Sequence, residues 1–74
     1  MARYRFDQLF VHDSRNNTLT PRVRIKMGPI ILSPGMTFNN TVVFAGVNFF
    51  DIIGYDIEVE LTIGDIYEIR GVYQ

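Results

Sequence analysis

The sequence predicts a single small domain over residues 1–74 that is mainly β, a small antiparallel half-open barrel or roll of five or six strands. Two stretches in which apolar and polar residues alternate strictly predict strands with one buried face. A Gly-Asp pair that joins one of them to a further stretch predicts a hairpin. Of the 74 residues, 47% are hydrophobic and 14% aromatic, which supplies one core and argues against disorder.

The two alternating stretches are residues 19–27 and 55–63, and in both the odd-numbered positions are apolar. Alternation of period two places the odd positions on one face of a strand, so we expect that face in the core. Gly64 and Asp65 then lead to residues 66–73, and this spacing predicts a two-residue turn of type I′ or II′. In the returning strand, alternation predicts one face with Ile66, Glu68 and Arg70, and another with Tyr67, Ile69 and Gly71.

Turn-forming residues divide the rest of the chain. Residues 13–18 predict a polar loop, residues 33–35 (Ser-Pro-Gly) a tight turn of type II, and residues 39–40 (Asn-Asn) another turn. Residues 41–45 are rich in β-branched and aromatic types, which predicts a strand. Pro21 has no backbone N–H to donate, so we expect it near the start or on the edge of its strand.

One short helical turn is predicted over residues 48–54. Asn48 is a favourable N-cap residue, Asp51 follows three positions later, and Gly54 is the residue type that commonly follows a helix end. This turn would bridge two strands.

Residues 6–10 have two interpretations. They form either a helical turn that directs Phe6, Leu9 and Phe10 inward, or part of a strand that runs over residues 3–12. The sequence leaves both open.

The small size of the domain limits its stability. A chain of this length buries roughly 60% of the surface that its unfolded form exposes, and natural domains of this size rely on disulfides, metals, oligomerisation or an unusually dense core. The chain has no cysteine, which excludes disulfides, zinc–thiolate sites and thiol nucleophiles. Its six phenylalanines and four tyrosines fit both an aromatic core and an interface between subunits.

The net charge is only −1, but it is unevenly distributed. Residues 1–37 carry a net charge of +4, and residues 38–74 carry −5. Because alternate side chains of a strand share one face, two sets of charged side chains are expected to form stripes. The basic stripe consists of Arg22, Arg24 and Lys26, and the acidic stripe of Asp56, Glu58 and Glu60.

The two stripes have three interpretations. They are neighbours in one sheet whose charges pair across the strands and set the register. Alternatively, they lie on different surfaces and meet across a subunit boundary, where complementary charge steers association. In the third interpretation the basic stripe binds nucleic acid, but a pI of 5.6 argues against this, because phosphate contacts normally require a clear positive excess.

Catalytic and metal-binding motifs are poorly supported. His12 is the single imidazole, and the adjacent Asp13 would point to the opposite side of a strand. Glu58 and Glu60 have a spacing compatible with paired catalytic carboxylates, but a solvated strand face accounts for them better. The glycines form neither a dinucleotide-binding motif nor a phosphate-binding loop. We therefore expect no catalytic residue, no cofactor and no metal site.

The sequence also bears on location. No stretch approaches the roughly 20 apolar residues needed to span a bilayer, and no apolar segment follows the charged residues 3–5 as in a secretory signal. We expect a soluble cytoplasmic protein of bacterial type with no membrane partner.

Several local motifs occur together in one order. They are Arg5-Phe6 followed by Leu9-Phe10, Thr20-Pro21-Arg22, Pro34-Gly35 with Phe38, and the acidic segment at residues 50–60. With this order of motifs over most of its length, the chain resembles small uncharacterised bacterial open-reading-frame proteins, a class that includes frames carried in mobile gene cassettes. The resemblance implies a compact stand-alone domain, and it implies no activity, cofactor or catalytic residue.

These observations favour a non-enzymatic interaction module that self-associates as a homodimer. The limited core, the many aromatic residues and the complementary stripes support this interpretation. The alternative is a small β-barrel that binds a small molecule or single-stranded nucleic acid.

Overall fold

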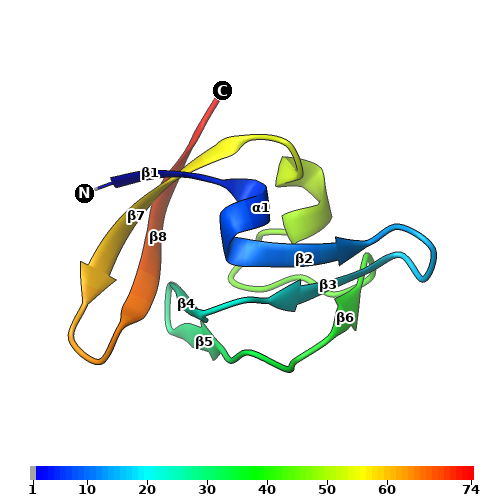
Figure 1. Ribbon diagram of the computed structural model, residues 1–74, viewed down its shortest axis with the longest axis horizontal. Helices are drawn as coiled ribbons and strands as arrows, with labels where there is room; N and C mark the ends of the chain where they lie inside the picture. The colour runs from blue at the N-terminus through cyan, green and yellow to red at the C-terminus, as the bar shows by residue number, and fades with distance from the viewer. Residues whose placement is uncertain (1) are drawn as a thin grey trace.

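The computed structural model describes residues 2–74, which form eight short strands, one turn of α-helix and one 3-10 turn (Figure 1). In chain order the elements are β1 (Ala2–Arg5), α1 (Phe6–Leu9), β2 (Phe10–Asp13), β3 (Thr18–Pro21), β4 (Arg24–Met27), β5 (Ile30–Leu32), β6 (Phe38–Asn39), η1 (Phe49–Ile52), β7 (Asp56–Thr62) and β8 (Ile66–Tyr73). The mainly β class is confirmed. Within residues 2–74, no helix is both long and apolar enough to cross a bilayer.

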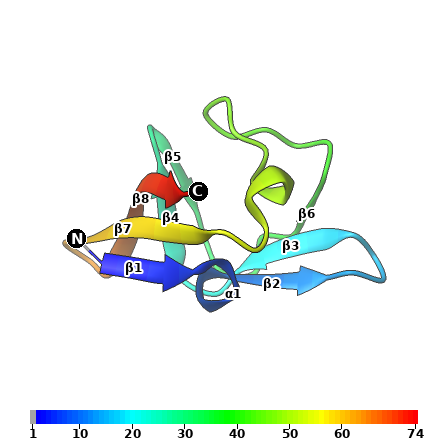
Figure 2. The same ribbon diagram turned by 90° about the horizontal axis from the view of Figure 1, so that it is seen from above.

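The strands form two sheets, and the chain passes between them four times. One sheet has the order β1-β7-β8-β4-β5, and the other has the order β2-β3-β6. The crossings are α1, which joins β1 to β2, and the connections from β3 to β4, from β5 to β6 and, through η1, from β6 to β7. Figure 2 shows β1, α1 and β2 following one another along one side of the molecule. The result is an open two-sheet roll, antiparallel except for the parallel pair β4–β8.

The first alternating stretch is divided between the two sheets. Its residues 19–21 belong to β3 and its residues 24–27 to β4, so the prediction of one continuous strand is wrong. A bend at Arg22 and Val23 separates them. Pro21, which has no N–H for a continuing ladder, is the last residue of β3, beyond the two positions at which β6 pairs with that strand. Of the two predicted positions, the one near the strand start is therefore wrong, whereas the unpaired side of Pro21 fits the one at an edge.

The predicted inward face is nevertheless correct on both sides of the bend, since Leu19 of β3 and Ile25 of β4 are fully buried. Val23 is half-buried and packs against the same core. Alternation therefore continues through a change of sheet, because the bend turns the chain without changing which side chains face the interior. In the second alternating stretch the predicted face is correct only in the middle, where Ile57 is fully buried and Val59 is 1% exposed, whereas Tyr55, Leu61 and Ile63 at its ends are exposed.

The β7–β8 hairpin is present with a different loop and a bulge. The register pairs Thr62 with Ile66, so three residues form the loop where two were predicted. Gly64 and Asp65 both have positive φ, at 84° and 59°, which accounts for the Gly-Asp signal.

Further along β8, Val59 lies opposite Ile69 whereas Glu58 lies opposite Gly71. Arg70 is thus an extra residue in a β-bulge. The bulge brings Gly71 to the face of Glu58, which corrects the face predicted from strict alternation.

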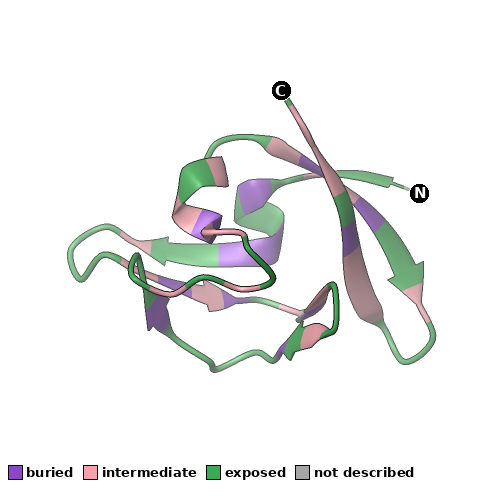
Figure 3. Ribbon diagram, turned by 180° about the vertical axis from the view of Figure 1, so that it is seen from behind, coloured by how far each residue is buried: buried purple, intermediate pink, exposed green. Residues whose placement is uncertain are grey.

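Phenylalanine rings form the centre of the core between the two sheets. Figure 3 colours the buried residues of both sheets and of the two helical turns purple. Phe49 is fully buried, and its ring centroid lies 5.0 Å from that of Phe10 and 6.0 Å from that of Phe38. Phe6 stacks on Phe10 at 4.8 Å. Such aromatic pairs each add about 0.5–1.5 kcal/mol beyond the burial of their surface. The expected aromatic core is therefore the feature that joins α1, β2, β6 and η1.

Both short helical segments are present. Residues 6–9 form α1 with Phe6 and Leu9 buried, and strands flank it on both sides, so the helical interpretation holds for these residues and the strand interpretation for their neighbours. The Asn48 side chain accepts a hydrogen bond from the backbone N–H of Phe50 at 3.0 Å and caps η1, as its residue type predicts.

Three of the predicted turns are confirmed. Residues 14–17 form the polar loop after β2. In the turn at residues 33–36 the Met36 N–H donates to the Ser33 carbonyl oxygen at 3.1 Å, and Gly35 has the positive φ that type II requires. The Asn39 side chain accepts from the backbone N–H of Thr41 at 3.0 Å and closes the third turn.

The strand predicted at residues 41–45 is absent. Phe44 and Val47 instead exchange two backbone hydrogen bonds of 2.9 and 2.8 Å around a tight turn. Ala45 and Gly46 both have positive φ, at 50° and 79°, the signature of a type I′ turn. The β-branched residues at 41–43 therefore lead into a turn without a partner strand.

Candidate binding site

The two charged stripes lie in the same sheet but are not adjacent. β4 carries Arg24 and Lys26, β7 carries the acidic stripe, and β8 lies between these two strands. The stripes therefore do not pair with each other, and one member of each forms an ion pair with β8. Lys26 Nζ lies 3.6 Å from a carboxylate oxygen of Glu68, and Arg70 Nε lies 3.8 Å from one of Glu60. The structure is thus close to the first of the three interpretations, with β8 supplying the opposite charges.

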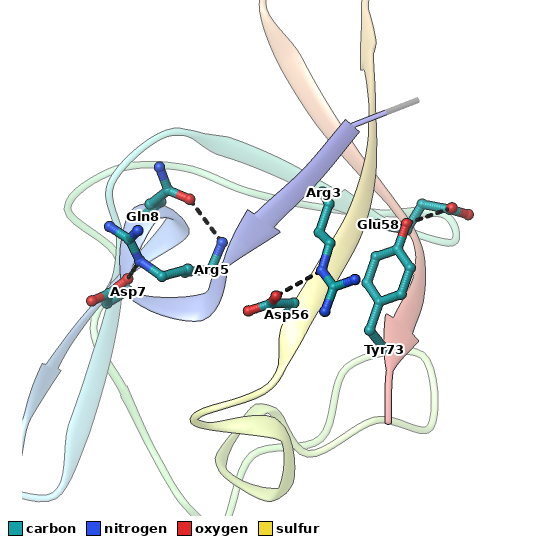
Figure 4. A network of polar contacts seen from close by, with 7 residues as sticks. All are labelled: Arg3, Arg5, Asp7, Gln8, Asp56, Glu58 and Tyr73. Carbon is teal, nitrogen blue, oxygen red and sulfur yellow. Dashed lines mark hydrogen bonds and ion pairs between the residues drawn. The ribbon is translucent and has the colours of Figure 1, made fainter.

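The other two acidic residues have partners on β1 and β8 (Figure 4). Asp56 accepts from Arg3 Nε at 2.7 Å, and Glu58 accepts from the Tyr73 hydroxyl at 2.9 Å. The Arg3 guanidinium also lies 4.3 Å from the centre of the Tyr73 ring. The hydrogen bond to Glu58, followed by desolvation, raises the pKa of the Tyr73 phenol above its ordinary value of 10.0.

Arg22 is separated from the rest of the basic stripe. Because it occupies the bend between β3 and β4, its side chain turns toward α1, where its Nε donates to the carbonyl oxygen of Asp7 at 2.9 Å. Its backbone N–H donates to the Leu9 carbonyl oxygen at 2.8 Å. Arg24, in contrast, donates to the Gly64 carbonyl oxygen at 3.1 Å. The three basic residues therefore do not form one continuous surface.

Arg22 and Asp56 instead both line an open pocket of about 430 Å³. One wall comes from the β1–α1–β2 segment, and the other from the residues after η1 up to the first residue of β7. Arg22 completes the rim. The lining residues are Arg5, Phe6, Asp7, Phe10, Val11, His12, Arg22, Ile53, Gly54 and Asp56. The lining therefore combines buried aromatic rings with exposed charged groups.

The charged groups of the pocket differ in whether they already have partners. Arg5 Nε lies 3.2 Å from a carboxylate oxygen of Asp7, and Asp56 is held by Arg3 (Figure 4). In residues 2–74, no carboxylate lies within ion-pair distance of Arg22. The two acidic groups of the pocket are therefore neutralised, whereas one of its cations is not.

The candidate catalytic groups face different partners. The ring of His12 is exposed and lies edge-on to Phe50, with centroids 6.0 Å apart. The Asp13 carboxylate accepts hydrogen bonds from the backbone and side chain of Asn16, which lower its pKa below the ordinary value of 3.8. It is therefore directed to the loop and does not orient the imidazole.

Other potential chemistry has no geometric support. Glu58 and Glu60 bind separate partners, Tyr73 and Arg70. In the part of the chain that the structure describes, no three His, Asp or Glu side chains converge as metal ligands.

The sequence identified two lining residues of this pocket as candidates, Arg22 and Asp56, and gave His12 no catalytic role. Arg5, Val11 and Ile53 had no signal of their own. They come together because β1 pairs with β7 in a register that sets Arg5 opposite Asp56. That pairing joins segments about fifty residues apart, and nothing in the local pattern of either segment predicts it.

Comparison of the chain with protein-family models, with curated proteins and with solved structures finds no match.

Proposed function

We propose that the protein is a non-enzymatic binding module that holds a small molecule in the pocket between the β1–α1–β2 segment and residues 53–56. The observation that carries this proposal is the pocket itself. Its volume of about 430 Å³ falls within the range of roughly 300–1,000 Å³ that is usual for small-molecule sites.

The pocket combines an apolar floor with polar groups at its rim. Phe6 and Phe10 stack on each other with only 17° between their ring planes, and they are 4% and 1% exposed. Rings that are already fixed by packing lose little conformational freedom when a ligand arrives, which favours binding. The exposed Val11 side chain and Ile53 extend this apolar surface outward.

The same geometry weakens the argument for association through the charged stripes. Lys26, Glu60 and Asp56 have partners within their own sheet. A second subunit would have to compete with these contacts, so complementary stripes are a weaker basis for function than the pocket.

Filling the pocket tests the proposal. Val11→Trp places a large ring at the rim, so the amide NMR signals of residues around the pocket should no longer shift when neutral aromatic fragments such as benzyl alcohol are added. Ile31→Trp is the matched control, because Ile31 is a similarly exposed residue of a short strand outside the pocket. The proposal would be contradicted if the fragments caused no shifts in the wild-type protein, or if the same shifts persisted unchanged in Val11→Trp.

A second candidate function is self-association through the tip of the β7–β8 hairpin. Leu61 is 56% exposed and Ile63 is 97% exposed, so two large apolar side chains lie in solvent at one end of the molecule. Exposed apolar groups of this kind commonly mark contact surfaces. This candidate retains the predicted homodimer but moves its interface from the charged stripes to the hairpin tip.

A further inference from the structure

We propose that the ligand of the pocket is a small organic anion, with a carboxylate bound by Arg22 and an apolar body, such as an aromatic ring, placed against Phe6 and Phe10. This inference rests on the proposed function, and it adds the chemical class of the ligand and the residue that selects it.

The charge of the pocket is the first argument. Asp7 is paired with Arg5 at 3.2 Å, and Asp56 with Arg3 at 2.7 Å. Both acidic groups are therefore compensated before a ligand arrives. Arg22 contributes a further positive charge that no carboxylate in residues 2–74 neutralises. A single negative charge on the ligand would balance it.

The orientation of Arg22 is the second argument. Its Nε is occupied by the Asp7 carbonyl oxygen, which anchors one side of the planar guanidinium. Within residues 2–74 the two terminal nitrogens form no hydrogen bond or ion pair, so they are available as a pair of parallel donors. This fork matches the two oxygens of a carboxylate, and such bidentate pairs are stronger and more directional than the contact of a point charge. The anchoring bond limits the rotamers that the side chain would lose on binding.

The apolar part of the ligand follows from the floor and walls. Phe6, Phe10, Val11 and Ile53 supply apolar atoms within the same 430 Å³ space as Arg22. A free inorganic anion would leave this surface in contact with water, whereas an apolar ring beside the carboxylate would cover it. The pocket is thus built for a molecule that has one charged end and one apolar end.

Benzoate and benzyl alcohol form a suitable pair of probes, because they share a ring and differ in charge. Amide NMR titrations of the full chain should show both probes at the same pocket residues, with benzoate bound about tenfold more tightly, a factor at the low end for a charge-assisted hydrogen bond. Phenyl phosphate, titrated in parallel, distinguishes a carboxylate site from a phosphate site.

Substitution of the arginine provides the second arm. Arg22→Gln should weaken benzoate binding about tenfold and leave benzyl alcohol binding nearly unchanged. Arg22→Lys keeps the charge but loses the fork, so its affinity for benzoate should be intermediate. Arg24→Gln is the matched control: it makes the same change of charge at a residue outside the pocket, and it should bind benzoate as the wild type does.

The outcomes separate the two proposals. If neither probe shifts the pocket signals, the proposed function fails. If both bind with equal affinity, or if Arg24→Gln weakens benzoate as much as Arg22→Gln does, the pocket binds ligands but the anion selectivity is wrong. Tighter binding of phenyl phosphate than of benzoate would overturn the carboxylate assignment. The comparison of probes on the wild-type protein decides the point even if Arg22→Gln fails to fold.

Discussion

Tyr73 shows how one side chain can make stability depend on pH. Its neutral phenol donates to the Glu58 carboxylate at 2.9 Å, and this hydrogen bond is the largest cause of its raised pKa. A group whose pKa is raised by folding stabilises the native state at pH values below its unfolded pKa. That contribution disappears as the pH rises through the folded-state value, because the phenolate can no longer donate and is repelled by Glu58.

We therefore expect Tyr73→Phe to lower the free energy of unfolding at neutral pH. The difference from the wild type should vanish at a pH above the folded-state pKa of Tyr73. Urea denaturation at the two pH values measures this. Tyr55→Phe is the control, because Tyr55 is exposed and lies outside the Tyr73–Glu58 hydrogen bond. A Tyr73→Phe deficit that is the same at both pH values would contradict the argument.

At this scale, much of the fold could be predicted. Alternation placed Ile25, Ile57 and Val59 in the core because burial of one face is decided locally along each strand. It failed after Arg70, where one extra residue reverses the faces that follow. A bulge depends on how two strands match each other, so neither strand carries the information alone.

In the turn at Ala45 and Gly46, the alanine has an unfavourable backbone conformation. Alanine at a φ of 50° is costly because its Cβ crowds the following carbonyl group, by roughly 1–2 kcal/mol in a left-handed conformation. Asparagine tolerates this region better, and Asn-Gly is a strongly preferred pair in type I′ turns.

Ala45→Asn should therefore raise the free energy of unfolding by about 1 kcal/mol, measurable by thermal or urea denaturation. Gly46→Ala is the reverse test. It adds a Cβ at a φ of 79°, so it should destabilise the protein by about 1 kcal/mol or more. The assignment of the turn would be wrong if Ala45→Asn were destabilising or if Gly46→Ala were neutral.

The elements that sequence analysis missed depend on which strands pair with each other, and local sequence does not determine this pairing. Residues 41–45 have strand-forming side chains, but strand propensity reflects packing against a neighbouring strand, and no such neighbour forms here. Residues 19–27 alternate without interruption, yet the chain changes sheets at Arg22. Caps and turns were predicted well, since Asn48 and the Ser33–Gly35 turn act through bonds to residues two or three positions away.

At the scale of the molecule, two sheets share a core at one end, and the β7–β8 hairpin extends away from it at the other (Figures 1 and 3). β1 pairs with β7 only as far as Val59 within the described residues, so the tip with Leu61 and Ile63 has less cover than the rest of the sheet. The pocket could not be predicted because it depends on the pairing of β1 with β7, two segments far apart in the sequence. The exposure of the tip could not be predicted for the same reason, because it depends on where that pairing ends.

The exposed tip leads to a prediction about oligomeric state. Stable interfaces bury about 800 Å² per partner, more than two side chains provide, so we expect a weak dimer that forms only at micromolar concentrations or above. In sedimentation velocity, the average mass of the wild type should rise with concentration. It should change little with salt, because apolar contacts are not screened as ion pairs are. Leu61→Lys combined with Ile63→Lys should keep the protein monomeric.

Val43→Lys is the matched control for this test, because Val43 has the same 56% exposure as Leu61 but lies in the segment before the Ala45–Gly46 turn. It should associate as the wild type does. Association that weakens steeply with added salt and survives the double substitution would instead return the interface to the charged stripes, where Lys26 and Glu60 would have to exchange their partners on β8 for those of a second subunit. A monomer at all concentrations would exclude both interfaces and leave the pocket as the basis of function.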